Sequence, residues 1–381
     1  MSSHSATDQR GISHPLLGIA GLAFVVLAVV LLGMMPDKVS ALTTTITAIT
    51  FGLPVLIVTT LWWGGWPFQS MSRGAGGWAR FIFIIVATLV LTGIGQAVTG
   101  AFDFGWMFGT EGAFGIFPYG FVLAASIFIP MLQLTFVTGK APFHTMSPVA
   151  GGIAALATSW ALGLAQYFFL LHWIGGPGTP PAPPTVGNGA IYALDWPAVL
   201  LSIVVLQMVF FVLLKGWPFS AITNGVLRFI VVNIFTLGGG VLLFTGLIAL
   251  GLTGNQISAI AGSVTAAVIL MEILFDGWPF RGPDSAGTRV GKLIVMGLLT
   301  WGLYALLLTV GSIGYPEGPD APPTELWVAG IGLNIIAAFA ITHVAVFGRW
   351  PFPVAPAEAA EPAAAPNDAA HAPAEATPAE Q

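Results

Sequence analysis

The chain alternates between long apolar segments and short polar connections. Ten segments contain about 20 predominantly apolar residues, the length that a helix needs to cross a hydrocarbon layer of about 30 Å. They cover residues 15–35, 43–64, 80–101, 116–138, 150–174, 196–215, 227–251, 256–276, 291–312 and 325–347. None alternates with the period of two that a lipid-facing strand requires. The pattern therefore predicts an all-α polytopic membrane protein with ten transmembrane helices.

A short sequence, Gly-Trp-Pro-Phe, recurs after every even-numbered segment. Three copies are intact and two are relaxed, at residues 65–68, 216–219, 277–280, 139–143 and 348–352. Repetition at a fixed place in the chain indicates a repeated structural unit. Proline ends a helix, and glycine lets the chain turn at positive φ. We therefore expect five tandem parallel helical hairpins, each followed by this turn and arranged as a pseudo-fivefold ring.

Tryptophan is the second element of the repeated turn. Its ring prefers the headgroup level of a membrane, with the apolar body in the boundary and the N–H toward water. The sequence thus predicts four interface anchors, Trp66, Trp217, Trp278 and Trp350, with Ala141 in the equivalent place of the second unit. The alternative, functional interpretation is that the turns surround a cytoplasmic mouth or dock a partner.

Composition supports a membrane location. The 381 residues are 56% hydrophobic and 7% charged, with a mean hydropathy of +0.89. A soluble domain carries about 25% charged residues, so this chain could not cover a water-facing surface. Cysteine is absent, which excludes disulfides, thiolate nucleophiles and cysteine metal ligands.

Three parts of the chain differ in composition. Residues 1–14 are polar and form a predicted cytoplasmic N-terminal segment, and residues 15–352 form the transmembrane domain. The first apolar segment is longer than the roughly 7–15 residues of a signal-peptide core, so we interpret it as a retained helix. Residues 353–381 are rich in Ala, Pro and Glu, and such a segment cannot bury enough apolar area to fold. We expect this tail to be disordered and cytoplasmic.

The basic residues predict the orientation. All but Lys38 fall on the side of the repeated turns: Arg10, Arg73, Arg80, Lys140, Lys215, Arg228, Arg281, Arg289, Lys292 and Arg349. Positively charged residues stay on the cytoplasmic side of a membrane. The sequence therefore predicts a multi-pass protein of a bacterial-type inner membrane with both termini in the cytoplasm.

Glycine differs between odd and even segments. It is frequent in the third, seventh and ninth segments, which contain no charged residue between their ends. Small residues allow close helix packing or leave room for a lumen. From this composition we expect the odd helices to line the centre and the even helices to surround them.

The even segments carry polar residues at a similar depth. Gln133, Gln207, Glu272 and His343 precede the turn by a few residues, with Thr59 and Thr60 in the equivalent place of the second segment. In a ring, these side chains would form a polar belt near the cytoplasmic side and bind a solute. Glu272 is either a proton- or cation-coupling carboxylate, paired with His343, or a hydrogen-bonded group that ties two helices; intramembrane ionisable residues are functional by default.

The leading functional hypothesis is a transporter or pore for a small solute. The alternatives are a non-transporting subunit or scaffold of a larger membrane complex, and a membrane enzyme that handles a lipid or quinone. No catalytic, nucleotide or metal signature occurs, and two histidines at one depth on facing helices, as bis-histidine haem needs, are missing. We thus expect no cofactor, no metal and no nucleic acid. The expected partners are membrane lipid, a small solute, and either other membrane proteins or further copies of the chain. The five hairpins resemble, in architecture alone, the tellurite-resistance/dicarboxylate transporter and slow-type anion channel group.

Overall fold

The computed structural model describes residues 11–35, 38, 41–100, 118–173, 189–282, 284–316 and 322–354. The predicted N-terminal segment up to residue 10, most of the outer loops and the tail from residue 355 lie outside the described residues. Within them the chain is almost entirely helical, and the one named sheet pairs β1 (Leu171–His172) with β2 (Ile191–Tyr192) in parallel. The fold is therefore all-α, as predicted.

Nine helices of the described part are long and apolar enough to cross a membrane. They are Leu16–Gly33, Arg73–Thr99, Tyr119–Val137, Pro148–Leu170, Trp196–Leu213, Gly225–Ala249, Gly254–Leu274, Ala286–Gly314 and Thr324–Val346. A tenth apolar helix, Thr47–Trp62, is shorter, and the π-helical segment η2 (Ala41–Ile46) leads directly into it. Each predicted segment overlaps one of these helices, because an apolar segment in a membrane must satisfy its own backbone hydrogen bonds.

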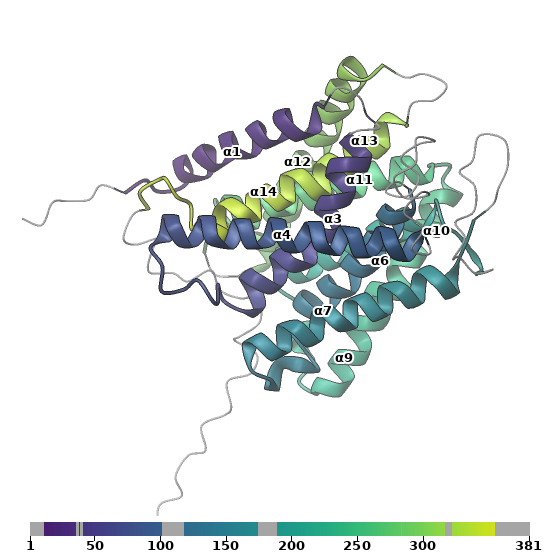
Figure 1. The fold of residues 1–381 in the computed structure, drawn as a ribbon, viewed down its shortest axis with the longest axis horizontal. Coiled ribbons are helices and arrows are strands. Elements are labelled where there is room, and N and C mark those ends of the chain that lie inside the picture. The colour runs from purple at the N-terminus through teal and green to yellow at the C-terminus, as the bar shows by residue number, and fades with distance from the viewer. Residues whose placement is uncertain are drawn as a thin grey trace, which may run out of the picture.

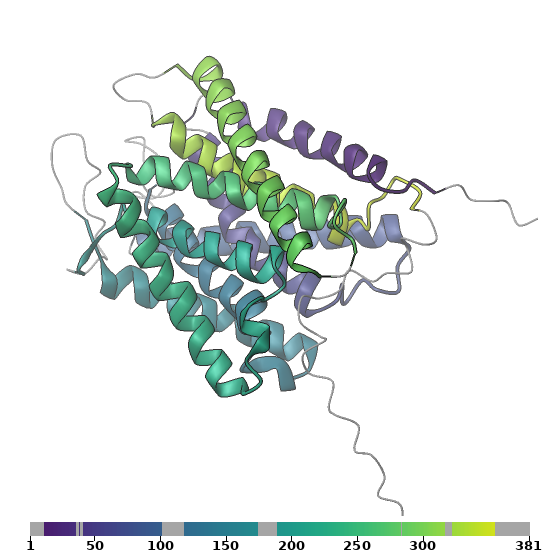
Figure 2. The ribbon, with the colours of Figure 1, turned by 180° about the vertical axis from the view of Figure 1, so that it is seen from behind.

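Six helices lie on the outside of the bundle, and most of their residues are exposed or only partly buried. They are α1 (Leu16–Ala28), α4 (Arg73–Thr99), α7 (Pro148–Ala165), α9 (Gly225–Asn233), α10 (Gly239–Ala249) and α12 (Ala286–Gly314). The share of buried residues in their apolar stretches is only 6–33%. Figure 1 shows α4 and α7 on one face, and Figure 2 shows the 225–249 and 286–314 helices on the opposite face.

The remaining helices form the interior. They are α3 (Thr47–Ile57), α6 (Tyr119–Leu132), α8 (Trp196–Leu206), α11 (Gly254–Ile269), α13 (Thr324–Gly330) and α14 (Ala337–Ile341), the last two joined by η12 (Ile331–Ile336). In the long inner helices 78–83% of the residues are buried. Helix α3 packs against α6, α6 against α8, α8 against α11 and α11 against α13, while η12 and α14 return to α3.

The expectation that odd helices line the centre was wrong. The even helices are inside and the odd helices cover them. Several glycines that suggested a lumen, such as Gly93, Gly238 and Gly297, have no other atom within 4 Å of an added Cβ. Others meet inner helices closely, as Gly240 meets Ile203. Composition misled because lipid-facing helices are also free of charge and tolerate small residues.

The five repeated turns have the same backbone. In each one, two successive residues adopt positive φ, as in Gly64–Gly65 and Gly348–Arg349, and the Pro of the motif follows a cis peptide bond. An amide in each turn bonds a carbonyl six residues earlier, for example Gly277 N to Met271 O at 2.8 Å. Glycine at one or both of the two positions accommodates a conformation that other residues adopt at a cost.

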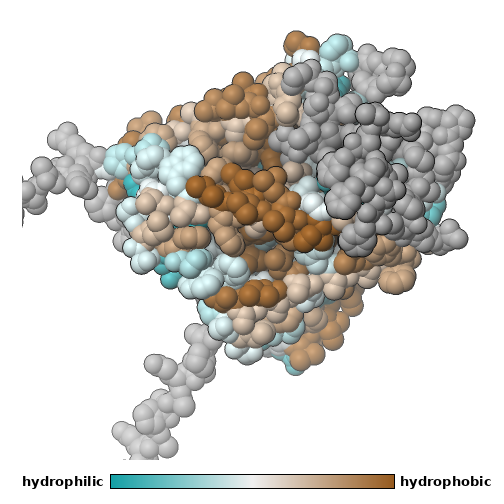
Figure 3. All heavy atoms as spheres, in the orientation of Figure 1, coloured by the Kyte–Doolittle hydropathy of each residue, from teal (hydrophilic) through white to brown (hydrophobic). Residues whose placement is uncertain are grey.

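The surface agrees with a membrane setting. Figure 3 shows apolar residues across the middle of the visible face, with paler and more polar residues toward the end at which α1 and α4 begin. Large side chains such as Leu242 and Trp301 are each 73% exposed on outer helices. A soluble monomer rarely exposes continuous apolar surface of this kind. The protein is therefore embedded in a membrane.

Candidate functional site

Five inner helices end in a π-helical segment just before the repeated turn. These segments are η3 (Val58–Trp62), η5 (Gln133–Val137), η8 (Gln207–Leu213), η11 (Leu270–Leu274) and η13 (Thr342–Val346). The polar residues predicted from sequence all lie in them. Gln133 and Gln207 open their segments, and Glu272 and His343 lie inside theirs. Short π-helical stretches within α-helices are frequent at functional sites.

Gln133 and Gln207 come into direct contact. Gln207 Nε2 donates to Gln133 Oε1 at 2.7 Å, and Gln133 Nε2 donates to Asn233 Oδ1 at 3.0 Å and to Thr236 Oγ1 at 2.8 Å. These four residues, which we call the amide cluster, join two inner helices to one outer helix. Gln207 is fully buried, yet its Oε1 has no hydrogen-bond donor among the described residues. The cluster therefore retains one buried acceptor that a ligand could use.

Glu272 forms an ion pair with a neighbouring helix. Lys292 Nζ lies 2.7 Å from Glu272 Oε1, and the two side chains are 6% and 10% exposed. The same ammonium donates to the Leu213 carbonyl at 3.3 Å. The sequence-based pairing of Glu272 with His343 was therefore wrong: the carboxylate binds Lys292, which lies near the start of α12. This geometry ties three helices together and favours the structural interpretation of Glu272.

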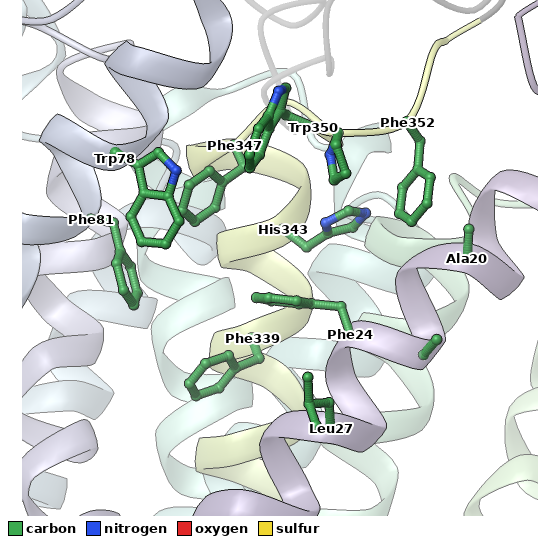
Figure 4. Close-up of a pocket in the computed structure, with 12 residues that line it drawn as sticks. Ala20, Phe24, Leu27, Trp78, Phe81, Phe339, His343, Phe347, Trp350 and Phe352 are labelled. Atoms are coloured by element: carbon green, nitrogen blue, oxygen red, sulfur yellow. The ribbon is translucent and has the colours of Figure 1, made fainter.

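His343 lies in a groove on the membrane-facing side. The groove has a volume of about 490 Å³ and is bounded by α1, α4, the α14–η13 helix and the last repeated turn. Figure 4 shows the imidazole between Phe24 and Phe352, and the ring centroids are 5.4 and 5.8 Å from that of His343. The residue is 2% exposed, and its Nε2 has no hydrogen-bond partner among the described residues.

The predicted polar residues do not form one continuous belt. The amide cluster, the Glu272–Lys292 pair and His343 have different partners and occupy different seams between inner and outer helices. Each of the three faces an outer helix. The amide cluster faces α9 and η10 (Ile234–Gly238), the Glu272–Lys292 pair faces α12, and His343 faces α1. They lie at a similar level because each is on the last turns of an inner helix.

Basic side chains bind the exposed carbonyls at the ends of the π-helical segments. Arg80 Nη1 donates to Ala345 O at 3.2 Å, and Arg349 Nη1 donates to Leu274 O at 3.0 Å. Positive charge is favourable at a helix C-terminus, where the carbonyls lack intrahelical partners. The same cations that predicted orientation therefore also complete the helix ends.

The four tryptophans predicted as interface anchors are half-exposed. Their exposed fractions are 46% for Trp66, 41% for Trp217, 43% for Trp278 and 40% for Trp350. Arg289 lies over the ring of Trp217 at 4.9 Å. This exposure places an indole where it could meet both lipid and water, and the assignment as anchors remains a prediction.

Sequence reasoning missed several partners. Lys292 was recognised only as one of the basic residues that predict the orientation, and not as the partner of Glu272. The aromatic residues around His343 come from three separate segments, and no local pattern joins them. Among the described residues no group of three or more His, Asp or Glu side chains could hold a metal ion.

Comparisons of the chain with protein-family models, with curated proteins and with solved structures found no match. The function must therefore be inferred from the geometry alone.

Proposed function

We propose that the protein is an integral membrane transporter for a small solute, built from ten spans as five tandem hairpins in a pseudo-fivefold ring. The contacts support the ring. The inner helices follow one another in chain order, and the last of them contacts the first. Each outer helix after α1 packs on the inner helix that precedes it, as α4 packs on α3 and α12 on α11, whereas α1 packs on η12 and α14 of the last inner helix. Repeated contacts of this kind are expected of parallel internal repeats.

The turns support an orientation with both termini in the cytoplasm. Turns far apart in the chain contact the same end of the bundle: Arg73 Nη2 donates to Phe352 O at 3.1 Å, and Arg80 lies against Gly65. At the other end, Lys38 Nζ donates to Thr324 Oγ1 at 2.7 Å. The basic residues on the side of the turns thus favour the cytoplasm of a bacterial-type inner membrane.

The observation that carries the transport proposal is the amide cluster. A fully buried carboxamide normally satisfies both of its polar ends, because an unpaired buried group costs about 1–3 kcal/mol. Gln207 Oε1 is unpaired where two inner helices become π-helical and meet an outer helix. An acceptor here suits a solute that donates an N–H or O–H. We therefore place a solute-binding step at Gln133 and Gln207.

Proteoliposome flux tests this proposal. The probes are urea, glycerol and methylammonium, three small solutes that donate hydrogen bonds, followed by light scattering after an osmotic step. We expect faster entry of at least one probe than in protein-free liposomes. Gln207→Met keeps the side-chain volume and removes the acceptor, so it should reduce that flux.

Gln166→Met is the matched control. Its amide donates to the Ser126 carbonyl at 3.4 Å and lies outside the amide cluster. This variant should transport like the wild type. Equal flux in protein-free and wild-type vesicles, or unchanged flux in Gln207→Met, would remove the proposed site. Glu272→Gln and His343→Ala, assayed in the same vesicles, test the other two sequence-predicted positions.

A scaffold in a larger membrane complex is the second candidate. The Glu272–Lys292 pair favours it, because this polar contact satisfies itself and ties helices together. Purification in mild detergent separates the two functions. Stable co-migrating membrane proteins together with absent flux would support the scaffold.

A further inference from the structure

The His343 groove is separate from the amide cluster, and the transport proposal does not use it. Its walls come from parts of the chain that are far apart in sequence: Phe24 on α1, Trp78 and Phe81 on α4, Phe339 on α14, and Phe347 and Phe352 around the last turn. The groove volume of about 490 Å³ is in the range of small-molecule sites, roughly 300–1,000 Å³.

The groove opens toward the lipid. At its edges, Trp78 is 49% exposed and Leu27 is 54% exposed, and both belong to outer helices. A molecule could therefore enter sideways from the membrane between α1 and α4. Figure 4 shows the rings of Phe24, Phe339 and Phe347 arranged around the open space beside His343. Flat aromatic walls favour a flat guest, because stacked and edge-on ring contacts add to the area that is buried.

His343 is a polar side chain in the groove that lacks, within the described part of the chain, a hydrogen-bond partner for one of its ring nitrogens. The imidazole is buried among phenyl rings, and its Nε2 has no hydrogen-bond partner among the described residues. Helix α1 approaches it closely because residue 21 is glycine: an added Cβ there would lie 2.9 Å from His343 Cδ2 and 3.1 Å from His343 Nε2. An imidazole can donate or accept a hydrogen bond, and a buried one gains from a partner. A saturated acyl chain offers no such partner.

We propose that this groove binds a membrane-soluble molecule with a flat ring that carries a carbonyl oxygen, of the quinone class. The ring lies among the aromatic walls, a carbonyl oxygen accepts a hydrogen bond from His343, and the apolar tail leaves between α1 and α4 into the lipid. The proposal concerns binding alone and includes no electron transfer.

Quenching of tryptophan fluorescence by ubiquinone-1 tests the proposal, since Trp78 and Trp350 line the groove. The full chain is purified in detergent and titrated with this short-tailed quinone. We expect saturable quenching by the wild type. His343→Leu should weaken binding about tenfold, the effect of losing one hydrogen bond in an apolar site. Ala23→Phe, which fills the groove from an exposed position of α1, should abolish saturable quenching.

Val30→Phe is the matched control, because Val30 is a 53% exposed residue of the same helical rod and does not line the groove. It should bind ubiquinone-1 like the wild type. Size-exclusion profiles and thermal unfolding establish that each variant is folded. Non-saturable quenching of the wild type would overturn the proposal, as would equal affinity in a folded His343→Leu variant.

Competition with decanol distinguishes a ring site from a chain site. If decanol displaces ubiquinone-1 as well as a ring compound of similar size does, the groove binds alkyl chains and the proposal is wrong. Gln207→Met should leave quinone binding unchanged. Failure of the flux assay therefore does not affect this inference, and failure of quinone binding does not affect the transport proposal.

Discussion

The effects of removing Glu272 and Lys292 on the stability of the protein should depend strongly on each other. The two charged atoms are 2.7 Å apart, and both side chains are almost fully buried. Removing one partner leaves the other as an uncompensated charge, which costs about 3–5 kcal/mol in buried pairs. We therefore expect Lys292→Met and Glu272→Leu each to lower the free energy of unfolding by about 3–5 kcal/mol.

The double variant should be far less damaging than the sum of the two. Replacing both partners with apolar groups of similar size is often neutral or stabilising, because no buried charge remains. Lys292 also donates to the Leu213 carbonyl, and losing this bond should leave a residual cost of about 1.5–3 kcal/mol. The coupling energy between the two positions should thus be about 3 kcal/mol or more.

Equilibrium unfolding by SDS in mixed micelles, followed by far-UV circular dichroism, measures these free energies. Ser312→Ala on the exposed part of α12 is a control and should change stability by less than about 0.5 kcal/mol. If the losses of unfolding free energy in the two single variants sum to the loss in the double variant within about 0.5 kcal/mol, the two sites are independent and the ion-pair reasoning is refuted.

Two further predictions concern helix packing and helix ends. An added Cβ at Gly262 would lie 2.8 Å from the Ala329 carbonyl oxygen, so Gly262→Ala should destabilise the protein by about 1–3 kcal/mol. An added Cβ at Gly297 would have no other atom within 4 Å, so Gly297→Ala should stabilise the protein by about 0.5–1 kcal/mol. Thermal unfolding should show a lower melting temperature for Gly262→Ala and a higher one for Gly297→Ala, and a shift in the same direction for both would contradict this. Arg349→Met removes the bond to the Leu274 carbonyl and should cost about 1.5–3 kcal/mol; unchanged SDS unfolding would contradict this.

The helices themselves could be predicted from the sequence. Long apolar segments have one stable backbone in lipid, so the ranges 196–215 and 256–276 closely match Trp196–Leu213 and Gly254–Leu274. The turns were also predictable, because Gly, Trp and Pro each restrict the chain locally. The π-helical ends were not predictable, since an apolar segment is equally compatible with backbone hydrogen bonds of the i→i+4 and the i→i+5 type.

The candidate sites were predictable only in part. Gln133, Gln207, Glu272 and His343 were singled out because polar groups are costly at membrane depth. Their partners required the fold: Gln207 contacts Gln133 across 74 positions, and Lys292 reaches Leu213 across 79. No local sequence pattern identifies partners this far apart in the chain, so the false pairing of Glu272 with His343 could not be detected from the sequence.

The sequence by itself determined that this protein lies in a membrane, roughly where its apolar helices run, and where the chain turns. These properties follow from the transfer of apolar side chains and from the conformational limits of single residues, which act locally. The tertiary structure decided which helices are inside, which polar groups meet, and that aromatic residues from three segments surround one histidine. Lipid and protein interior are equally apolar, so hydrophobicity cannot distinguish a helix that faces lipid from one that faces other helices; only the packing of specific side chains can.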